Sequence, residues 1–380
     1  MSDTSSVFLS EQEILVRDSA RRITAEVIAP TAAERDRTSA WPSKELKSLA
    51  DVGLMGMHVP EEFGGSGASF VEYCLALEAI AGADAGVATI VHVHNSVAGT
   101  LNRIGNDEQK RRWLPAMVSG ENIGAYLLSE PHAGSDTAAM RTSARVDGDH
   151  YLLNGTKQWI SNGSEAGVGI VMAKNDKSAG TKGYSLFVVD PRDPAYKVLR
   201  VESKLGQHTA HTAQIQLDDL RVPLADRLGE EGSGYRTTMS LLSEGRVAIA
   251  AIAVGVAGAA LDAAVRYAKE REAYGRPIFE LQAVNFDLAD MATRVEIARQ
   301  YTTHAARLCV AGVPCAKEAS MAKLFASEIA EKVCSDAIQI HGGYGYVNDF
   351  PVERYYRDVR VTKIYEGTSH VQKLIIGRQL

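Results

Sequence analysis

The sequence predicts an α+β protein of several domains, with an N-terminal helical domain, a middle β-sandwich or barrel domain, and a C-terminal four-helix bundle. Two observations lead to this fold class. Apolar residues recur at helical spacing towards both ends of the chain, whereas short β-prone runs alternate with turn residues between them. The 380 residues are enough for two or three domains. The changes of pattern place the domains at 1–121, 122–231 and 232–380.

The N-terminal domain contains two helix-start signals. Ser10 followed by Glu13 has the spacing of a capping box, in which each side chain satisfies the backbone N–H of the other residue. Asn106 and Gln109 repeat this spacing, so a second helix is predicted to start there. The Gly- and Pro-rich run 60–67 is typical of a loop between helices.

The middle domain shows strand signals at short intervals. Asp147-Gly148 separates the β-prone runs 142–146 and 151–153, which is a strong indication of a hairpin. Further strands are predicted at 169–172, 185–189 and 214–217. Strands of this length with frequent turns favour a sandwich or a barrel.

Long helical patterns return in the C-terminal domain. Helices are predicted at 238–271, 281–311 and 316–340, and the Gly-rich run 342–345 stops the last of them. Long helices with short connections are typical of a bundle.

Composition excludes several classes of function. The net charge of −6 is spread without a basic block, which argues against binding to nucleic acid. The most apolar run, 247–261, is too short to cross a bilayer, so no membrane insertion is expected. Residues 1–10 have the features of neither a secretory signal nor a transit peptide. The four cysteines lack CxxC spacing and are expected to be buried thiols in a reducing compartment. We therefore expect a cytoplasmic protein.

Two segments around the middle domain are rich in small polar residues. The hydroxyls and backbone N–H groups of 126–136 could cradle an anionic or heteroaromatic group, or could form an ordinary surface loop. In 154–163, Trp159 is flanked by polar residues. It is either a platform for a planar ring or a half-buried core residue.

Two further segments lie in the C-terminal domain. Arg271 in 271–277 could pair with a phosphate, although Arg is favoured at helix ends in any case. After 339–345 comes 365–369, where Glu366 precedes Gly367. A carboxylate in such a turn is a candidate general base. It could equally be the first-turn Glu of the last helix.

Together these segments resemble the acyl-CoA dehydrogenase family. The resemblance rests on L-S-E-P-H-A-G-S-D at 128–136, Q-I-H-G-G-Y-G at 339–345 and Y-E-G-T-S at 365–369, and covers nearly the whole chain. It implies a homotetramer with one non-covalent FAD per subunit, bound between the β domain and the bundle. It also implies oxidation of an acyl-CoA to the trans-2-enoyl-CoA, with electrons passed to an electron-transfer flavoprotein, in the breakdown of fatty acids or branched-chain amino acids.

The resemblance also implies roles for individual residues. Glu366 matches the catalytic base. Family members often carry Glu or Gln where this chain has His370, and usually Asp where it has Ser243. The implied FAD contacts are Tyr126, Leu128, Ser129, Gly134, Ser135, Trp159, Ile160, Ser161, Arg271, Tyr274, Gln282, Gln339, Ile340, His341, Gly342, Gly343, Thr368, Ser369 and His370. The implied acyl-CoA contacts are Ser135, Ser243, Arg246, Tyr365 and Gly367. Of these, Arg271, Tyr274, Gln282 and 339–343 are expected to reach a neighbouring subunit's FAD.

The position of the base distinguishes members of the family. Some relatives place it on a bundle helix immediately before an Arg, where this chain has Gly245. Glu244 is one residue away and is expected to point to another side of the helix. The run 89–98 and Gly245 resemble short-chain members, so a short straight or branched acyl group is expected.

Two other functions are known for proteins of this fold. An acyl-CoA oxidase or a flavin-dependent monooxygenase would use the same fold, but the compact length and the intact 365–367 motif favour the dehydrogenase. A non-catalytic flavoprotein that binds nucleic acid would have a basic C-terminal extension, whereas this chain is acidic overall.

Overall fold

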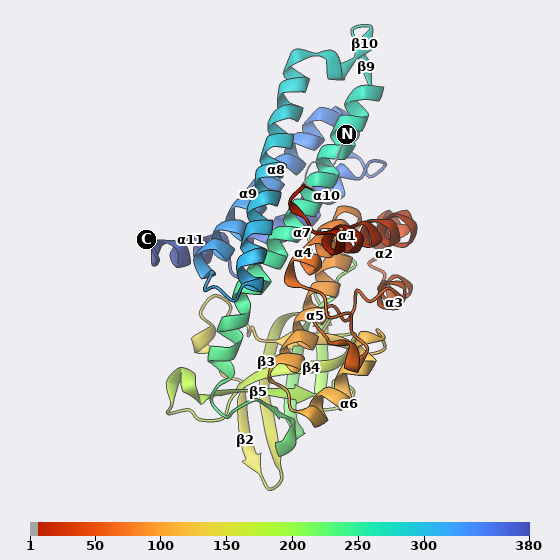
Figure 1. Cartoon of the computed structure of the whole chain (residues 1–380). Coiled ribbons are helices and arrows are strands. Elements are labelled where there is room, and N and C mark those ends of the chain that lie inside the picture. Colours follow the sequence, from red (N-terminus) through yellow and green to blue (C-terminus); the bar gives the residue numbers. More distant parts are fainter. Residues whose placement is uncertain (1–6) are drawn as a thin grey trace.

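A computed structural model describes residues 7–380, and its helical and β parts follow one another in the expected order. Figure 1 shows the first N-terminal helices beside the lower half of the long helices, while the last N-terminal helices lie lower, beside the β part. The N-terminal helices are α1 (Glu11–Ile23), α2 (Ala32–Thr38), α3 (Ser43–Asp51), α4 (Phe70–Ala83), α5 (Ala85–Ile104) and α6 (Asp107–Val118).

The two predicted helix starts are confirmed. Ser10 caps α1 and Asn106 caps α6, each in a complete capping box with the residue three positions later. Ser69 forms a third box with Glu72 at the start of α4, which the sequence reading did not identify. The predicted loop at 60–67 contains one 3₁₀ turn, Glu61–Phe63.

The middle part contains one eight-stranded sheet in the order β6-β7-β3-β2-β4-β5-β8, with β1 paired parallel to β4. The predicted hairpin joins β2 and β3 through Gly148, whose φ is +65°. The sequence reading missed β1, β6 and β8. The strands are β1 (Ile123–Leu127), β2 (Ser143–Asp147), β3 (His150–Ser161), β4 (Ala166–Lys174), β5 (Tyr184–Val189), β6 (Tyr196–Val201), β7 (Thr212–Pro223) and β8 (Arg227–Leu228).

The sheet has a core on each side. Val171 of β4 and Phe187 of β5 belong to a buried cluster to which β1 through β7 all contribute, so the sheet curves around its own core. Their neighbours Ile170 and Leu186 belong to a second cluster that includes residues of α5 and α6. This alternation follows from the two-residue period of a strand. It fixes the β part against the N-terminal helices.

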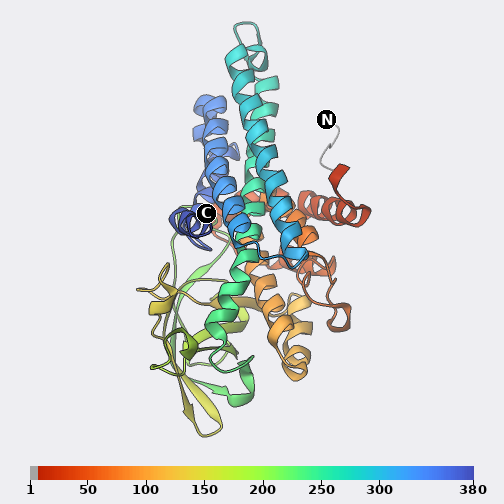
Figure 2. The same ribbon diagram turned by 60° about the vertical axis from the view of Figure 1, so that its left-hand side comes forward.

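The C-terminal part is a helical bundle whose three long helices run side by side in both views (Figures 1 and 2). The short α11 packs against α9. A two-strand hairpin of β9 (Glu272–Ala273) and β10 (Arg276–Pro277) caps the far end of the bundle and was not predicted. The helices are α7 (Gly234–Glu270), α8 (Gln282–Val310), α9 (Ala316–His341), α10 (Val352–Val359) and α11 (Ser369–Gly377).

Helix α7 is the apolar centre of the molecule. By length and composition it could cross a membrane, but 78% of its most apolar window is buried inside the protein. A Cβ on Gly255 would lie 2.2 Å from the carbonyl oxygen of Glu78, so this glycine allows α4 to approach closely. All four cysteines are free thiols; Cys74, Cys315 and Cys334 are buried and Cys309 is half-buried.

Candidate active site

Glu366 lies in the turn that leads into α11. Thr368 is the N-cap of α11, so Glu366 precedes the helix and is not its first-turn carboxylate. The φ angles of Glu366 and Gly367 are +53° and +90°. A left-handed conformation is unusual for a residue with a side chain, and such strain is typical of functional sites.

Two buried side chains hold this turn in place. Lys323 of α9 donates to the carbonyl oxygens of Tyr365 and Gly367. The amide of Gln372 in α11 donates to the carbonyl oxygens of Glu366 at 3.2 Å and Gly367 at 2.8 Å. All three carbonyl groups of the turn therefore have donors. Within residues 7–380, the N–H of Glu366 has no hydrogen-bond acceptor and stays available beside its own carboxylate.

Three cationic or polar groups surround the carboxylate of Glu366, whose side chain is 27% exposed. Burial alone would raise its pKa, but His92, Lys323 and Arg246 outweigh this effect, so the pKa of Glu366 is lowered. The buried guanidinium of Arg246 has its own pKa lowered by burial. The Nε of Arg246 makes no hydrogen bond within the described part of the chain. The arrangement favours an ionised carboxylate, which is the form that accepts a proton.

As expected, Gly245 of α7 faces Glu366, whereas Glu244 of the same helix points in another direction. A Cβ on Gly245 would lie 2.8 Å from Oε2 of Glu366, so this position faces the carboxylate directly. Glu244 instead forms an ion pair with Arg103 at 2.8 Å. The half-buried Ser243 lies one residue before it on α7.

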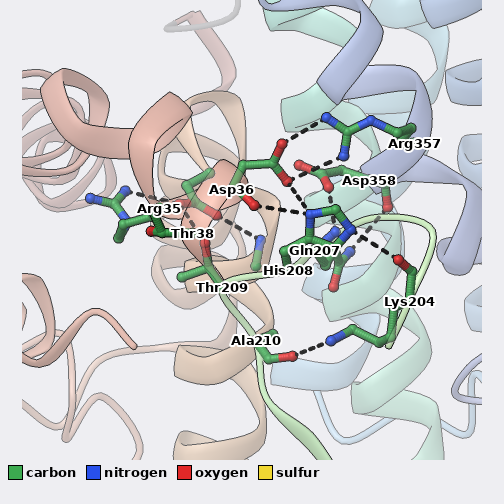
Figure 3. A network of polar contacts seen from close by, with 12 residues as sticks. Arg35, Asp36, Thr38, Lys204, Gln207, His208, Thr209, Ala210, Arg357 and Asp358 are labelled. Carbon is green, nitrogen blue, oxygen red and sulfur yellow. Dashed lines mark hydrogen bonds and ion pairs between the residues drawn. The ribbon is translucent and has the colours of Figure 1, made fainter. Parts of the chain in front are cut away.

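The loop before β7 contacts α2 and α10 (Figure 3), and Gln207 of this loop also reaches Tyr365. The backbone N–H of Gln207 donates to the carboxylate of Asp358 in α10, and its side-chain amide lies 3.5 Å from the hydroxyl of Tyr365. Thr89 of α5 donates to Gln207 Oε1 at 2.8 Å and lies 3.4 Å from the same hydroxyl. Asp36 of α2 completes the network through an ion pair with Arg357 at 2.7 Å and a contact with Nδ1 of His208 at 2.9 Å. Tyr365 is thereby held next to the Glu366 turn.

The 126–136 segment is organised by a buried ion pair that the sequence reading missed. Lys157 of β3 lies 3.1 Å from Glu130 and also donates to the carbonyl oxygens of Leu128 and Met172. Glu130 in turn accepts from the backbone N–H groups of 141 and 142. Burial lowers the pKa of Lys157 to about 8. Both residues lie in segments that the sequence analysis identified, but their pairing was not predicted because it depends on the sheet.

The predicted cofactor residues of the β part lie around this pair. The backbone N–H of Gln158 donates to the carbonyl oxygen of Ser129, which joins the two segments. Trp159 has a φ of +63° and is 60% exposed, so it is not a core residue. Leu128, Ser129, Ser161 and Tyr126 are half-buried, Gly134 and Ser135 are exposed, and Ile160 is buried. Tyr126 also contacts Thr238 of α7 at 2.9 Å.

A cavity of about 830 Å³ lies near the far end of the bundle, and its lining includes Arg271 and the predicted residues Ile340, His341, Gly342 and Gly343. The ring of His341 stacks on Tyr267 at 4.3 Å, so this side chain is used internally. Tyr274, Gln282 and Gln339 are exposed and lie outside the lining. Tyr267 of α7 also lines this cavity, and along the helix it is separated from Gly245 by about 33 Å.

The residues after Glu366 have different surroundings. Thr368 accepts from the N–H of Val371 as the N-cap of α11. Ser369 donates to Glu328 at 2.9 Å, whereas His370 is exposed. The structure therefore brings Arg246, Tyr365 and Gly367 to the base, and leaves Arg271 and its neighbours elsewhere.

Comparisons with known proteins agree along the whole chain. Residues 10–121, 125–220 and 232–380 match the N-terminal, middle and C-terminal domains of acyl-CoA dehydrogenases. An acyl-CoA dehydrogenase of Bacillus subtilis (strain 168) is 44% identical over 98% of both chains. The mitochondrial short-chain specific acyl-CoA dehydrogenase of Mus musculus is 43% identical, over 99% of this chain and 91% of its own length. A chain in the structure of the electron transferring flavoprotein of Acidaminococcus fermentans superposes with a TM-score of 0.96 at 41% identity, over 98% of both chains. This chain belongs to the acyl-CoA dehydrogenase family.

Proposed function

We propose that this protein is an FAD-dependent dehydrogenase that oxidises a short-chain acyl-CoA to the trans-2-enoyl-CoA, with Glu366 as the base. The proposal rests on the combination of two groups in one residue. Glu366 has a carboxylate whose pKa is lowered, and its backbone N–H has no acceptor within the described chain. An acyl thioester needs both groups: a donor for its carbonyl oxygen and a base for its α-proton.

The residues of the chain account for the proton transfer. The thioester oxygen accepts from the N–H of Glu366, which stabilises the negative charge that develops on this oxygen. The carboxylate of Glu366 then takes the α-proton and becomes neutral. The nearby Arg246 and Lys323 favour the carboxylate before the transfer. When bound, FAD supplies the oxidising group that accepts the β-hydride.

Features of the β part support binding of a flavin ring. The exposed Trp159 offers an aromatic face in a backbone conformation that few residues adopt. A Cβ on Gly134 would meet nothing within 4 Å, so the loop beside it is open to a ligand. We propose that 126–135 and 159–161 contact the ring and ribityl chain, and that 368–370 complete this site.

The distant cavity supports an oligomer. The guanidinium of Arg271 could form bidentate hydrogen bonds with a pyrophosphate. Gly342 and Gly343 are open to a ligand because nothing lies within 4 Å of their Cβ positions. The separation of about 33 Å along α7 makes it difficult for one cofactor to reach both sites of a single subunit. We propose that Arg271, Tyr274, Gln282 and 339–343 contact the FAD of a neighbouring subunit in a homotetramer.

The remaining details rest on relatives. Similarity to the short-chain specific enzyme of Mus musculus supports a short acyl group. We further propose a role in fatty-acid or branched-chain amino-acid breakdown. Similarity to a chain in an electron transferring flavoprotein structure supports such a flavoprotein as the electron acceptor. We propose domain limits of 1–121, 122–231 and 232–380. We also propose a cytoplasmic location, which is supported by the four free cysteine thiols.

An anaerobic titration tests this function. The purified protein is analysed for released flavin and then mixed with butyryl-, isovaleryl-, hexanoyl- and palmitoyl-CoA while flavin absorbance is followed. We expect FAD, and faster reduction by the short acyl groups than by palmitoyl-CoA. Finding FMN, or no reduction by any acyl-CoA, would contradict the proposal. Fastest reduction by palmitoyl-CoA would contradict only the chain-length preference.

A further inference from the structure

A buried histidine faces the base and has no assigned role. His92 of α5 is 3% exposed, and its Nε2 lies 3.7 Å from Oε1 of Glu366. This Nε2 is buried and makes no hydrogen bond within residues 7–380. At 3.7 Å the contact is too long for a hydrogen bond, but a small movement of the partly exposed Glu366 side chain would close it. A buried polar atom without a hydrogen bond lowers the stability of the fold, so the orientation of Nε2 towards the carboxylate indicates a functional role.

The other side of the ring is fixed by Tyr73 of α4. The Tyr73 hydroxyl lies 2.9 Å from Nδ1 of His92 and 3.3 Å from the backbone carbonyl oxygen of the same residue. When the hydroxyl donates to Nδ1, the ring hydrogen is on Nε2 and points to Glu366. When it donates to the carbonyl oxygen instead, it can accept from Nδ1. The Tyr73 hydroxyl therefore satisfies Nδ1 of His92 in either tautomer. Only the tautomer with its hydrogen on Nε2 presents a donor to Glu366, because the other would place the Nε2 lone pair against the carboxylate.

We propose that His92, held by Tyr73, is a positioning residue for the base, with its Nε2–H directed at the Glu366 carboxylate. This inference rests on the proposed role of Glu366. A donor at this place orients the carboxylate towards the substrate and favours its ionised form. It also explains why a polar ring occupies a buried position on α5.

Other charged and polar groups near the carboxylate also influence the pKa of Glu366. Lys323 and Arg246 favour its ionised form, and both remain when His92 is replaced. The hydroxyls of Tyr73, Tyr126 and Tyr365 are close enough for the charge of Glu366 to contribute to raising their own pKa values, whose main cause is burial. Because burial raises the pKa of Glu366 and His92 opposes it, loss of His92 moves the pKa upwards. The base is then protonated over a wider range of acidic pH.

The test uses the holoenzyme and three variants. His92→Phe keeps a ring without a donor, His92→Gln keeps a donor, and Tyr73→Phe removes only the hydroxyl. Two quantities are measured against pH: kcat/KM with butyryl-CoA, and the infrared carboxyl band that Glu366→Gln removes. His94→Gln is the matched control, since His94 is buried on the same helix but hydrogen-bonds to Met55 and Gly124.

We expect His92→Phe to move the acidic limb of kcat/KM and the infrared midpoint to higher pH, with much of the activity recovered at alkaline pH. His92→Gln should move them less, Tyr73→Phe should move them in the same direction, and His94→Gln should leave them in place. A uniform loss of activity without any shift in His92→Phe would overturn the inference. If His92→Phe does not fold, the same criterion applies to Tyr73→Phe. A shifted infrared midpoint in a protein that oxidises no acyl-CoA would refute the proposed function and leave the role of His92 standing.

Discussion

Replacing Gly245 by Ala should impair catalysis without weakening the fold. The added methyl group would lie 2.8 Å from Oε2 and 3.2 Å from Cδ of Glu366. Ordinary contacts begin near 3.5 Å, so the carboxylate must move by about 0.7 Å. Because a misplacement of about 1 Å can cost about 100-fold, we expect kcat to fall about 10- to 30-fold.

The stability of Gly245→Ala should rise although its activity falls. Ala is favoured over Gly in a helix interior by about 0.5–1 kcal/mol. Gly258→Ala on the same helix is the matched control, because the nearest atom to its Cβ is Nη2 of Arg299 at 3.4 Å. The assay compares kcat with butyryl-CoA and the denaturant midpoint for both variants. Full activity in Gly245→Ala, or a lower midpoint that explains its loss, would refute the reasoning.

Three further results are expected. Lys323→Met leaves the carbonyl oxygen of Tyr365 without a donor, while Gln372 still donates to that of Gly367. Urea unfolding should therefore show a loss of about 1–3 kcal/mol, whereas the exposed Lys332→Met should stay near wild type. Burial raises the pKa of Asp358 to about 7, so this group contributes stability at low pH that is lost as pH rises through about 7. Asp358→Asn should therefore lose stability less steeply between acidic and neutral pH than wild type, and an unchanged slope would count against this. Arg271→Ala should lower the FAD content after gel filtration; undiminished FAD would argue against its proposed contact.

The elements that the sequence predicted correctly are those decided within a few residues. The Ser10 capping box, the turn at Gly148 and the end of α9 at Gly342 each depend on local backbone chemistry. β1 was missed because it pairs with β4, far along the chain, and its buried I-G-A-Y-L run does not alternate. Propensity cannot reveal a partner that only the tertiary structure supplies.

The same limit applies to the site. The turn at Glu366 was found through its motif, and the importance of Gly245 followed from the resemblance to relatives that carry the base at that position. Helix geometry added only that Glu244 should point to another side of α7. His92, Lys323 and Gln372 carry no motif, because their contacts with the turn arise when α5, α9 and α11 pack together. A buried polar residue in an otherwise apolar helix is the only signal that could have identified them.

The central claim is that Glu366 removes the α-proton. The most direct measurement is the rate of anaerobic flavin reduction by butyryl-CoA in Glu366→Gln, with Glu244→Gln as the control that loses the neighbouring carboxylate of α7. We expect Glu366→Gln to bind FAD and acyl-CoA but to reduce its flavin at least about 10²–10⁴-fold more slowly. Glu244, paired with Arg103, should be replaceable with only a small effect on the rate. Normal reduction in Glu366→Gln together with an inactive Glu244→Gln would contradict the claim and place the base on α7.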